Sequence, residues 1–247
     1  MRTRGNTVLI TGGSAGIGLA LAKALIAADN TVIVCGRDQT RLERAHEVVP
    51  GISTIKCDVT RDDDVADLLK KVRSDFPQLN ILINNAAIMH ICDFVEKVEG
   101  SERIEEEVGI NLLAPMKLTS QLLPDLQQQT ASAIVIVSSG LAYVPVANVA
   151  VYCATKAGLH SFSRALRHRL RKTDVKVFEL PPPLVDTDLS RTLHMPKIQA
   201  EQVAKELLRG MERDRYEVRV GMVKPLYVAS QLVPLFIERI LNKAFSN

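Results

Sequence analysis

Short apolar runs alternate with longer segments of helical composition along the chain. Seven runs have the length and β-branched content of strands: Thr7–Thr11, Thr31–Cys35, Ser53–Cys57, Ile81–Asn84, Ala133–Ser138, Val175–Leu180 and Glu217–Val220. The helical segments begin near Gly16, Gln39, Arg61, Glu102, Val149 and Gln199, and the longest cover Met116–Gln129 and Ala150–Lys172. This alternation predicts an α/β fold, a doubly wound parallel sheet of about seven strands with helices on both faces.

Composition narrows the classes of protein that fit. The chain has 247 residues, 47% of them hydrophobic, which suits one domain over residues 1–247. The formal net charge is +3 and the charges are mixed, so no nucleic-acid partner is indicated. No apolar run reaches the length of a transmembrane segment, and the first expected strand begins where a signal peptide would lie. We therefore expect a cytoplasmic protein.

The four cysteines do not indicate a metal site. Cys35, Cys57, Cys92 and Cys153 are scattered, without the paired spacing of zinc ligands. Cys35 and Cys57 end two expected strands, so we interpret them as small buried hydrophobic residues. The expected compartment is a reducing one.

A tyrosine and a lysine four residues apart give the first sign of chemistry. Tyr152 and Lys156 would share one face of the helix over Ala150–Lys172, so the ammonium can lie beside the phenol. A positive neighbour lowers the pKa of a tyrosine from its usual value of about 10, and such a phenol can transfer a proton near neutral pH. The spacing alone is a weak signal, because it occurs by chance in many helices.

A glycine-rich turn after the first expected strand gives the second sign. The run Thr11-Gly12-x-x-x-Gly16-x-Gly18 joins that strand to an Ala- and Leu-rich helix, the context in which such a loop binds a dinucleotide. Gly12 allows the tight turn, Gly16 lets the backbone approach a pyrophosphate, and Gly18 lets the helix pack on the strand. The helix N-terminus would then face the phosphates. A turn that only joins two elements is the less favoured alternative.

Together these motifs resemble the classical short-chain dehydrogenase/reductase family over essentially the whole chain. The glycine loop matches the family's cofactor loop, and Asn84-Asn85-Ala86-Ala87 matches its Asn-Asn-Ala-Gly element. The family's catalytic four are matched in order and spacing by Asn111, Ser139, Tyr152 and Lys156. Further blocks are similar to a bacterial branch, the DltE-like oxidoreductases. The resemblance implies a Rossmann-type fold and an NAD(P)-dependent oxidoreductase that moves a hydride between the nicotinamide and a carbonyl or alcohol substrate.

The resemblance also implies roles for single residues. Tyr152 would exchange the proton with the substrate oxygen, and Lys156 would lower the pKa of Tyr152 and hold the nicotinamide ribose. Ser139 would donate a hydrogen bond to the substrate oxygen, with Ser138 as its rival, and Asn111 would position a water. The implied cofactor-binding residues are Gly12, Ser14, Ala15, Gly16, Ile17, Gly18, Arg37, Asp58, Val59, Asn85, Ala86, Tyr152, Lys156, Pro182, Val185 and Thr187.

Two positions depart from the family pattern. Ala87 stands where the family usually has glycine, and Pro183 takes the glycine place in the block Pro182-Pro183-Leu184-Val185-Asp186-Thr187. Proline fixes φ and removes a hydrogen-bond donor. The loop that would meet the nicotinamide is therefore stiffer than in the family.

The end of the second expected strand bears on the choice between NADP and NAD. A carboxylate there would bind the ribose 2′-hydroxyl and repel a 2′-phosphate. Gly36 occupies that place, and Arg37 follows with a planar fork that suits a phosphate. We expect a preference for NADP, with NAD possible. Ala15 stands where many NADP-using relatives have a second basic residue, Arg41 could assist, and the alternative is that Arg37 is an ordinary exposed arginine.

Two other functions compete with this interpretation. A non-catalytic dinucleotide-binding regulator on the same fold would be expected to lose Tyr152 or Lys156, and both are present. A serine hydrolase that uses Ser139 would need a Gly-x-Ser-x-Gly elbow, and the serine lacks one. The oxidoreductase interpretation is therefore favoured.

Three segments carry further expectations. The loop over about 184–200 is expected to cover the substrate, and His194 within it is interpreted as a solvated histidine. The apolar segment Pro225–Phe245, broken at Pro234, is expected to form a wall of the substrate pocket or a subunit contact, with a membrane-touching helix as the alternative. Family members assemble through their two long helices, so a homodimer or homotetramer is expected.

Overall fold

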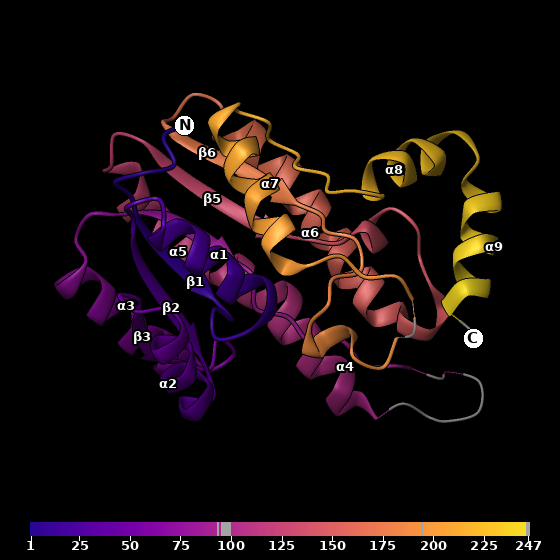
Figure 1. Ribbon diagram of the computed structural model, residues 1–247, viewed down its shortest axis with the longest axis horizontal. Coiled ribbons are helices and arrows are strands. Elements are labelled where there is room, and N and C mark those ends of the chain that lie inside the picture. Colours follow the sequence, from indigo (N-terminus) through magenta and orange to yellow (C-terminus); the bar gives the residue numbers. More distant parts are fainter. Residues whose placement is uncertain (93, 95–99, 194, 246–247) are drawn as a thin grey trace.

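The computed structural model describes residues 1–92, 94, 100–193 and 195–245 (Figure 1). In these residues six parallel strands form one sheet in the order β3-β2-β1-β4-β5-β6. The strands are β1 (Thr7–Thr11), β2 (Thr31–Gly36), β3 (Ser53–Lys56), β4 (Leu79–Asn84), β5 (Ser132–Val137) and β6 (Val175–Leu180). The expected α/β class is confirmed.

Helices follow the strands in the expected alternation. Their bounds are α1 (Gly16–Ile26), α2 (Gln39–Val48), α3 (Asp62–Asp75), α4 (Ser101–Val108), α5 (Ala114–Gln127), α6 (Ala150–Arg169), α7 (Ala200–Glu212), α8 (Val223–Leu232) and α9 (Pro234–Phe245). A single π-helical stretch, η1 (Gly109–Leu113), joins α4 to α5. Short 3-10 turns are η2 (Gly140–Ala142), η3 (Ala147–Val149) and η4 (Asp188–Ser190).

The core has two halves, because successive side chains of a strand point to opposite faces of the sheet. Ile10 belongs to the half that contains Leu21 of α1 and Leu207 of α7. Its neighbour Leu9 belongs to the half that contains Leu122 of α5 and further residues of α3 and α6. The central strands β1, β4 and β5 are buried on both faces, which explains why their sequences are nearly continuous apolar runs instead of alternating ones.

The segment expected to form a seventh strand lies at the edge of the sheet, but it pairs with β6 through a single bridge only. Glu217 makes one parallel bridge to Glu179 of β6. The Val218 amide donates to the Glu179 carbonyl at 2.8 Å, and the Glu179 amide donates to the Tyr216 carbonyl at 2.7 Å. The segment therefore extends the sheet by one bridge, and no regular strand forms there.

The strand order reverses between β1 and β4, which lie side by side although α1, β2, α2, β3 and α3 separate them in the sequence. In open α/β sheets, ligands bind beyond the carboxyl ends of the strands at such a reversal. The segments that follow β1, β4, β5 and β6 all leave the sheet at this edge. The topology thus gathers the glycine turn, the Asn85 region, Ser139 and the Pro182 region in one place.

The last two helices stand apart from the sheet and project at one end of the molecule (Figure 1). Pro234 separates them: α8 ends at Leu232, and the proline occupies the first position of α9, where its missing N–H has no intrahelical partner to lose. Leu241 and Phe245 of α9 pack against the cluster that contains Tyr152. This contact supports the pocket-wall interpretation. Across the described residues, no helix has both the length and the apolar character of a membrane span.

Candidate active site

The glycine loop is shaped by close backbone contacts. Gly12 has φ +63°, and a Cβ on it would lie 2.8 Å from the Ala86 Cα, a distance that real Cβ atoms do not reach. The Asn85 amide group donates to the carbonyls of Thr11 and Gly12, at 3.0 Å each, and ties the turn after β4 to the loop. Only glycine permits this approach with this φ.

The N-terminus of α1 opens into the same region. Its N-cap residue is Ala15, whose methyl group cannot accept a hydrogen bond from the first N–H groups of the helix. Gly16 has φ +51°, and a Cβ on it would lie 2.9 Å from the Thr187 methyl. The uncapped helix start, with its partial positive charge, suits an anion such as a pyrophosphate.

A cleft of about 680 Å³ runs along this edge of the sheet. Fourteen of the residues expected to bind cofactor line it: Gly12, Ser14, Ala15, Gly16, Ile17, Arg37, Asp58, Val59, Asn85, Ala86, Tyr152, Lys156, Pro182 and Thr187. Gly18 and Val185 do not line it. Gly18 lies beneath the loop, where a Cβ would be 2.3 Å from the Gly12 carbonyl oxygen, and Val185 is buried in the core.

The tyrosine and the lysine lie together, as their spacing in the sequence predicts. Lys156 Nζ is 5.5 Å from the centroid of the Tyr152 ring and donates to the Val137 carbonyl at 2.9 Å. Only 8% of Tyr152 and 2% of Lys156 is exposed. Ser139 lies near enough to the phenol to affect its pKa. The helix face of α6 and the end of β5 thus bring together three of the four residues expected to be catalytic.

Burial dominates the acid–base properties of this pair. It raises the pKa of Tyr152 above its ordinary value, and the hydrogen bond with Ser139 acts in the opposite direction. It also lowers the pKa of Lys156 to about 8, against a raising effect of Glu107. The lowered phenol pKa that the sequence suggested is therefore absent from the protein itself, because loss of solvation, together with the charges of Cys153 and Glu107, outweighs the effect of Ser139.

Asn111 occupies the π-helical turn and is fully buried. Its side chain accepts from the Ile88 amide at 2.9 Å and donates to the Ile88 carbonyl at 2.8 Å. It also donates to Thr155 Oγ1, 3.3 Å away on α6. Asn111 thus holds the turn after β4 against the helix that carries Tyr152 and Lys156. π-Turns are rare and occur frequently at functional sites.

The structure distinguishes the two serines at the end of β5. Ser138 donates to Glu179 Oε1 at 2.6 Å, and the same buried carboxylate accepts from Ser163 and pairs with His160 at 2.8 Å. The Ser138 hydroxyl is thereby occupied. Ser139 Oγ accepts from the Leu141 amide at 3.1 Å, which leaves its proton for the phenol or a substrate oxygen. Ser139 is the serine that the geometry favours.

The far end of the cleft contains the residues expected to select the cofactor. Arg37 is exposed and pairs with Glu106 at 3.2 Å, and Arg41 pairs with Asp188 at 3.2 Å. Partial burial opposes ionisation of Asp58. Hydrogen bonds from Thr60 and the charges of Arg37 and Arg61 outweigh it, and the pKa of Asp58 is lowered. Two guanidinium groups therefore border the opening next to Gly36.

The structure adds residues that sequence reasoning missed. Met89 and His90 line the cleft after β4. Glu107 is fully buried one turn before Asn111. Its position four residues before Asn111 was a usable signal, because such residues share a helix face. His194 lies outside the described residues. The two ends of the expected substrate loop are joined by a parallel β-bridge between Val185 and Ile198.

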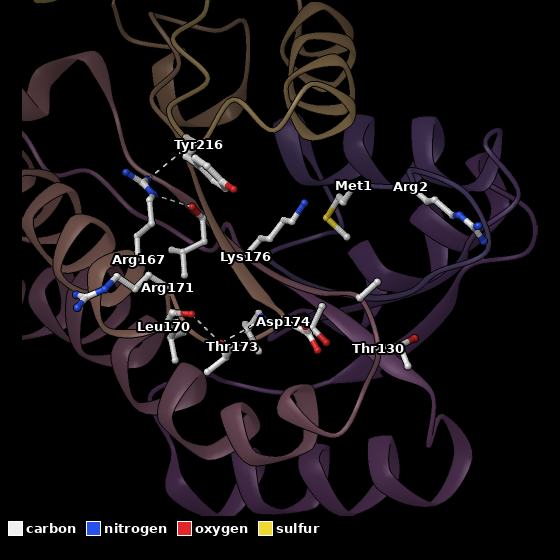
Figure 2. Close-up of a pocket in the computed structure, with 14 residues that line it drawn as sticks. Met1, Arg2, Thr130, Arg167, Leu170, Arg171, Thr173, Asp174, Lys176 and Tyr216 are labelled. Atoms are coloured by element: carbon white, nitrogen blue, oxygen red, sulfur yellow. Dashed lines mark hydrogen bonds between the residues drawn. The ribbon is translucent and has the colours of Figure 1, made fainter.

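A second hollow, of about 420 Å³, lies away from the cleft (Figure 2). Arg167 donates there to the Val177 and Tyr216 carbonyls, and Lys176 pairs with Asp214 at 2.8 Å. These basic groups are already partnered. None of the expected site residues lines this hollow, so the candidate active site is the cleft at the glycine loop.

A family model described as short chain dehydrogenase matches residues 6–198. The chain belongs to the short-chain dehydrogenase family. This short-chain dehydrogenase is 42% identical over 237 residues to the uncharacterized oxidoreductase DltE of Bacillus subtilis strain 168, covering 94% of each chain. The expected likeness to DltE-type oxidoreductases is thus confirmed.

Solved structures of family members superpose on nearly the whole chain. A short chain dehydrogenase from Burkholderia cenocepacia J2315, in complex with NADP, has a TM-score of 0.86 and 25% identity over 98% of this chain and 99% of its own. The bulky-bulky ketone specific alcohol dehydrogenase from Comamonas testosteroni has a TM-score of 0.78 and 26% identity, with coverages of 95% and 92%. The likeness covers both ends of the cleft.

Proposed function

We propose that this short-chain dehydrogenase is an NADP(H)-preferring oxidoreductase that interconverts a carbonyl group and an alcohol, built as one domain over residues 1–247. The observation that carries the proposal is that Tyr152 and Lys156 line the same cleft as the glycine loop and Arg37, with Ser139 near the Tyr152 phenol. A phenol, a lysine and a dinucleotide-shaped cleft are the parts that hydride transfer to a carbonyl requires.

The residues of the cleft fit a nicotinamide dinucleotide. Gly12 and Gly16 leave space that a Cβ would fill, and the N-terminus of α1 offers N–H groups to a pyrophosphate. Asp58 and Val59 line the opposite end, where the adenine would bind, and Lys156 would hold the nicotinamide ribose. When bound, the dinucleotide supplies or accepts the hydride. The known complex of the Burkholderia cenocepacia relative with NADP supports this assignment.

Tyr152 transfers the proton in this mechanism. In reduction its hydroxyl donates to the carbonyl oxygen as the hydride reaches the carbon, and in oxidation the phenolate accepts the alcohol proton. Ser139 donates a hydrogen bond to the same oxygen, where negative charge develops. Lys156 holds positive charge near the phenol. Because burial raises the phenol pKa, the phenolate forms only where positive charge faces it, and an oxidised nicotinamide ring adds such charge.

The groups near Tyr152 indicate an apolar substrate. Met89, Leu141, Leu241 and Phe245 pack around the cluster of Val146, Val149, Tyr152 and Cys153. An apolar wall binds hydrocarbon groups that flank a carbonyl better than charged ones. The test is turnover of a panel of aldehydes, ketones and diketones of increasing apolar size, with NADPH and with NADH. Cofactor binding without turnover of any member would contradict the proposed activity.

Arg37→Ala is expected to weaken NADP binding and leave NAD binding nearly unchanged. Arg37 is exposed and can turn from Glu106 towards a 2′-phosphate at the mouth of the cleft. A charge-assisted hydrogen bond is worth about 1.5–3 kcal/mol, so a loss of about 10- to 100-fold in NADP affinity is expected. Fluorescence titration with NADP and with NAD measures both affinities. Arg44→Ala, on the exposed side of α2, is the control and should leave both unchanged. Equal losses for NADP and NAD would refute the phosphate assignment.

Gly36→Asp is expected to reverse the cofactor preference. A Cβ at Gly36 would lie 3.5 Å from Ser14 Oγ, so the larger residue fits. Its carboxylate would repel a 2′-phosphate and accept from a ribose 2′-hydroxyl. The ratio of kcat/KM for NADPH and NADH should change by about 100-fold or more in favour of NADH. Gly36→Asn, similar in shape but neutral, is the control, and an equal effect of both variants would show that size, not charge, decides.

We also propose a homodimer or homotetramer in a reducing cytoplasm. Ala154, Ala157 and Ala165 are exposed along the outer side of α6, where small side chains allow a second helix to approach. Cys35 and Cys57 are neighbouring buried thiols, which is consistent with a reducing compartment. Light scattering of Ala157→Arg against the unchanged chain tests the interface, and a dimer in both would contradict it.

A further inference from the structure

A buried carboxylate next to the catalytic lysine has no role in the mechanism above. Glu107 of α4 is 0% exposed. Its Oε2 accepts a long hydrogen bond of 3.4 Å from the His90 amide. Its Oε1 has no hydrogen-bond partner among the described residues, and this is uncommon for a buried side-chain oxygen. Such an exception calls for a reason.

The position of Glu107 links it to the catalytic group. Glu107 and Asn111 lie four residues apart on one helical face, and they accept from His90 and Ile88, alternate residues of one extended segment. Asn111 reaches Thr155, the neighbour of Lys156 on α6. Glu107 thus lies against the same side of α6, in electrostatic contact with Tyr152, Cys153 and Lys156.

We propose that Glu107 is the proton-carrying residue behind Lys156, which recharges the lysine between turnovers and keeps it positive. The inference rests on the proposed function. Glu107 touches neither substrate nor nicotinamide, so it is a positioning residue in this reaction. Oε1 is the atom that would carry the proton, and the proton would reach the lysine through water.

The proton balance of the relay is complete. In reduction Tyr152 gives its proton to the carbonyl oxygen, and Lys156 returns one to the phenolate. The neutral amine then takes a proton from the carboxylic acid of Glu107, and the resulting carboxylate is reprotonated from solvent. His90, whose amide donates to Glu107, has a side chain that is 29% exposed and lines the cleft, so it connects Glu107 to solvent-accessible space. In oxidation each proton moves in the opposite direction.

The acid–base properties of the two groups agree with such a transfer. Burial raises the pKa of Glu107 to about 7, against lowering effects of His90 and Lys156. Burial lowers the pKa of Lys156 to about 8, and Glu107 acts to raise it. The two pKa values lie close together, which favours proton exchange in both directions. The titratable groups that face Glu107 are Lys156, Tyr152, Cys153, His90 and Glu106.

A purely structural role is the competing explanation. Glu107 could serve only to hold the His90 amide, as Asn111 holds Ile88. A glutamine would keep that hydrogen bond and the shape of the side chain, but it cannot release a proton. Glu107→Gln therefore separates the two roles, and Glu105→Gln, on the exposed side of the same helix, is the matched control.

The experiment compares pH profiles of the two variants and the unchanged enzyme, with a carbonyl substrate and NADPH. Glu107→Gln should lose about 100-fold in kcat, the lower end for a proton-transfer group, with KM changed less than about threefold. The limb of the profile that belongs to Lys156 should move to lower pH, because the lysine loses a negative neighbour. Glu105→Gln should match the unchanged enzyme. An unaltered kcat and profile in Glu107→Gln overturns the inference.

Thermal unfolding provides a second readout that needs no turnover. The pKa of Glu107 is raised on folding, so the group costs stability as pH rises from about 4.5, its unfolded value, to about 7. Glu107→Gln should therefore gain Tm over the unchanged protein at pH 8 and show little difference at pH 4.5. A Tm loss at pH 8 would show that the carboxylate only supports the fold. Turnover that is lost in Tyr152→Phe but intact in Glu107→Gln rejects the relay and keeps the proposed function.

Discussion

Tyr152→Phe is expected to reduce turnover by about 10³-fold or more and to leave cofactor affinity within about threefold of the unchanged enzyme. In the proposed mechanism the phenol transfers the proton, and positioned acids and bases contribute about 10²–10⁴ in rate. Phenylalanine keeps the ring on which Lys156 lies at 5.5 Å, and the packing against Cys153 and Val149. The cleft should therefore keep its shape.

The measurement separates binding from chemistry. Fluorescence titration gives the affinity for NADPH, and loss of reduced-nicotinamide absorbance gives turnover. Tyr216→Phe, a half-exposed tyrosine at the second hollow, is the matched control and should behave as the unchanged enzyme. Full turnover in Tyr152→Phe would remove the central role of the phenol, and equal losses of binding and turnover would indicate a damaged cleft.

Gly12→Ala is expected to reduce cofactor affinity by about 100-fold or more and to destabilise the protein by several kcal/mol. The added Cβ would lie 2.8 Å from the Ala86 Cα, so the loop or the turn after β4 must move. Neither can move freely, because Asn85 holds the Gly12 carbonyl and the Thr11 hydroxyl accepts from the Ala86 amide at 3.1 Å. A shifted loop no longer presents its N–H groups to a pyrophosphate.

Gly5 offers a matched control for the effect of the positive φ angle alone. Its φ is +69°, close to the +63° of Gly12, but nothing lies within 4 Å of a Cβ placed on it. Gly5→Ala should lower the free energy of unfolding by only about 1 kcal/mol, the cost of a left-handed conformation for alanine, and should bind cofactor normally. Denaturant unfolding and cofactor titration check both variants. Similar losses of stability and cofactor affinity in Gly12→Ala and Gly5→Ala would show that the φ angle, and not the contact with Ala86, matters at Gly12.

The sequence correctly predicted those features that depend on residues close together in the chain. The apolar runs gave the strands, since a strand buried on both faces has no polar alternation, and the spacing of Tyr152 and Lys156 gave their shared helix face. The seventh strand was not found as such, because Glu217–Val220 has strand composition but reaches only one bridge at the edge of the sheet. Whether an edge segment pairs regularly depends on its neighbours.

Electrostatics could not be predicted from spacing. The sequence places a lysine near the phenol, and from this alone a lowered phenol pKa follows. In the structure both groups are almost completely buried, and desolvation raises the pKa of Tyr152. Burial depends on α4, α6 and the turn after β4 packing together, so it is invisible along one helix.

The reason why Ser139 differs from Ser138 also lies in the tertiary structure, although the resemblance to the family already favoured Ser139. Both serines stand at the end of β5, and their sequence neighbours are alike. Glu179 on the adjacent strand β6 captures Ser138 at 2.6 Å and leaves Ser139 available. That partner is 41 residues away in the chain.

By itself, the sequence determined the α/β alternation, the glycine turn and the pair Tyr152 and Lys156, because each depends on residues within a few positions of one another. Only the tertiary structure decided the buried environment of Glu107, the pairing of Ser138 with Glu179 and the position of Arg37 beside Glu106. These depend on segments that the parallel sheet brings together at the reversal between β1 and β4, and the desolvation and pairing there arise only when those segments pack.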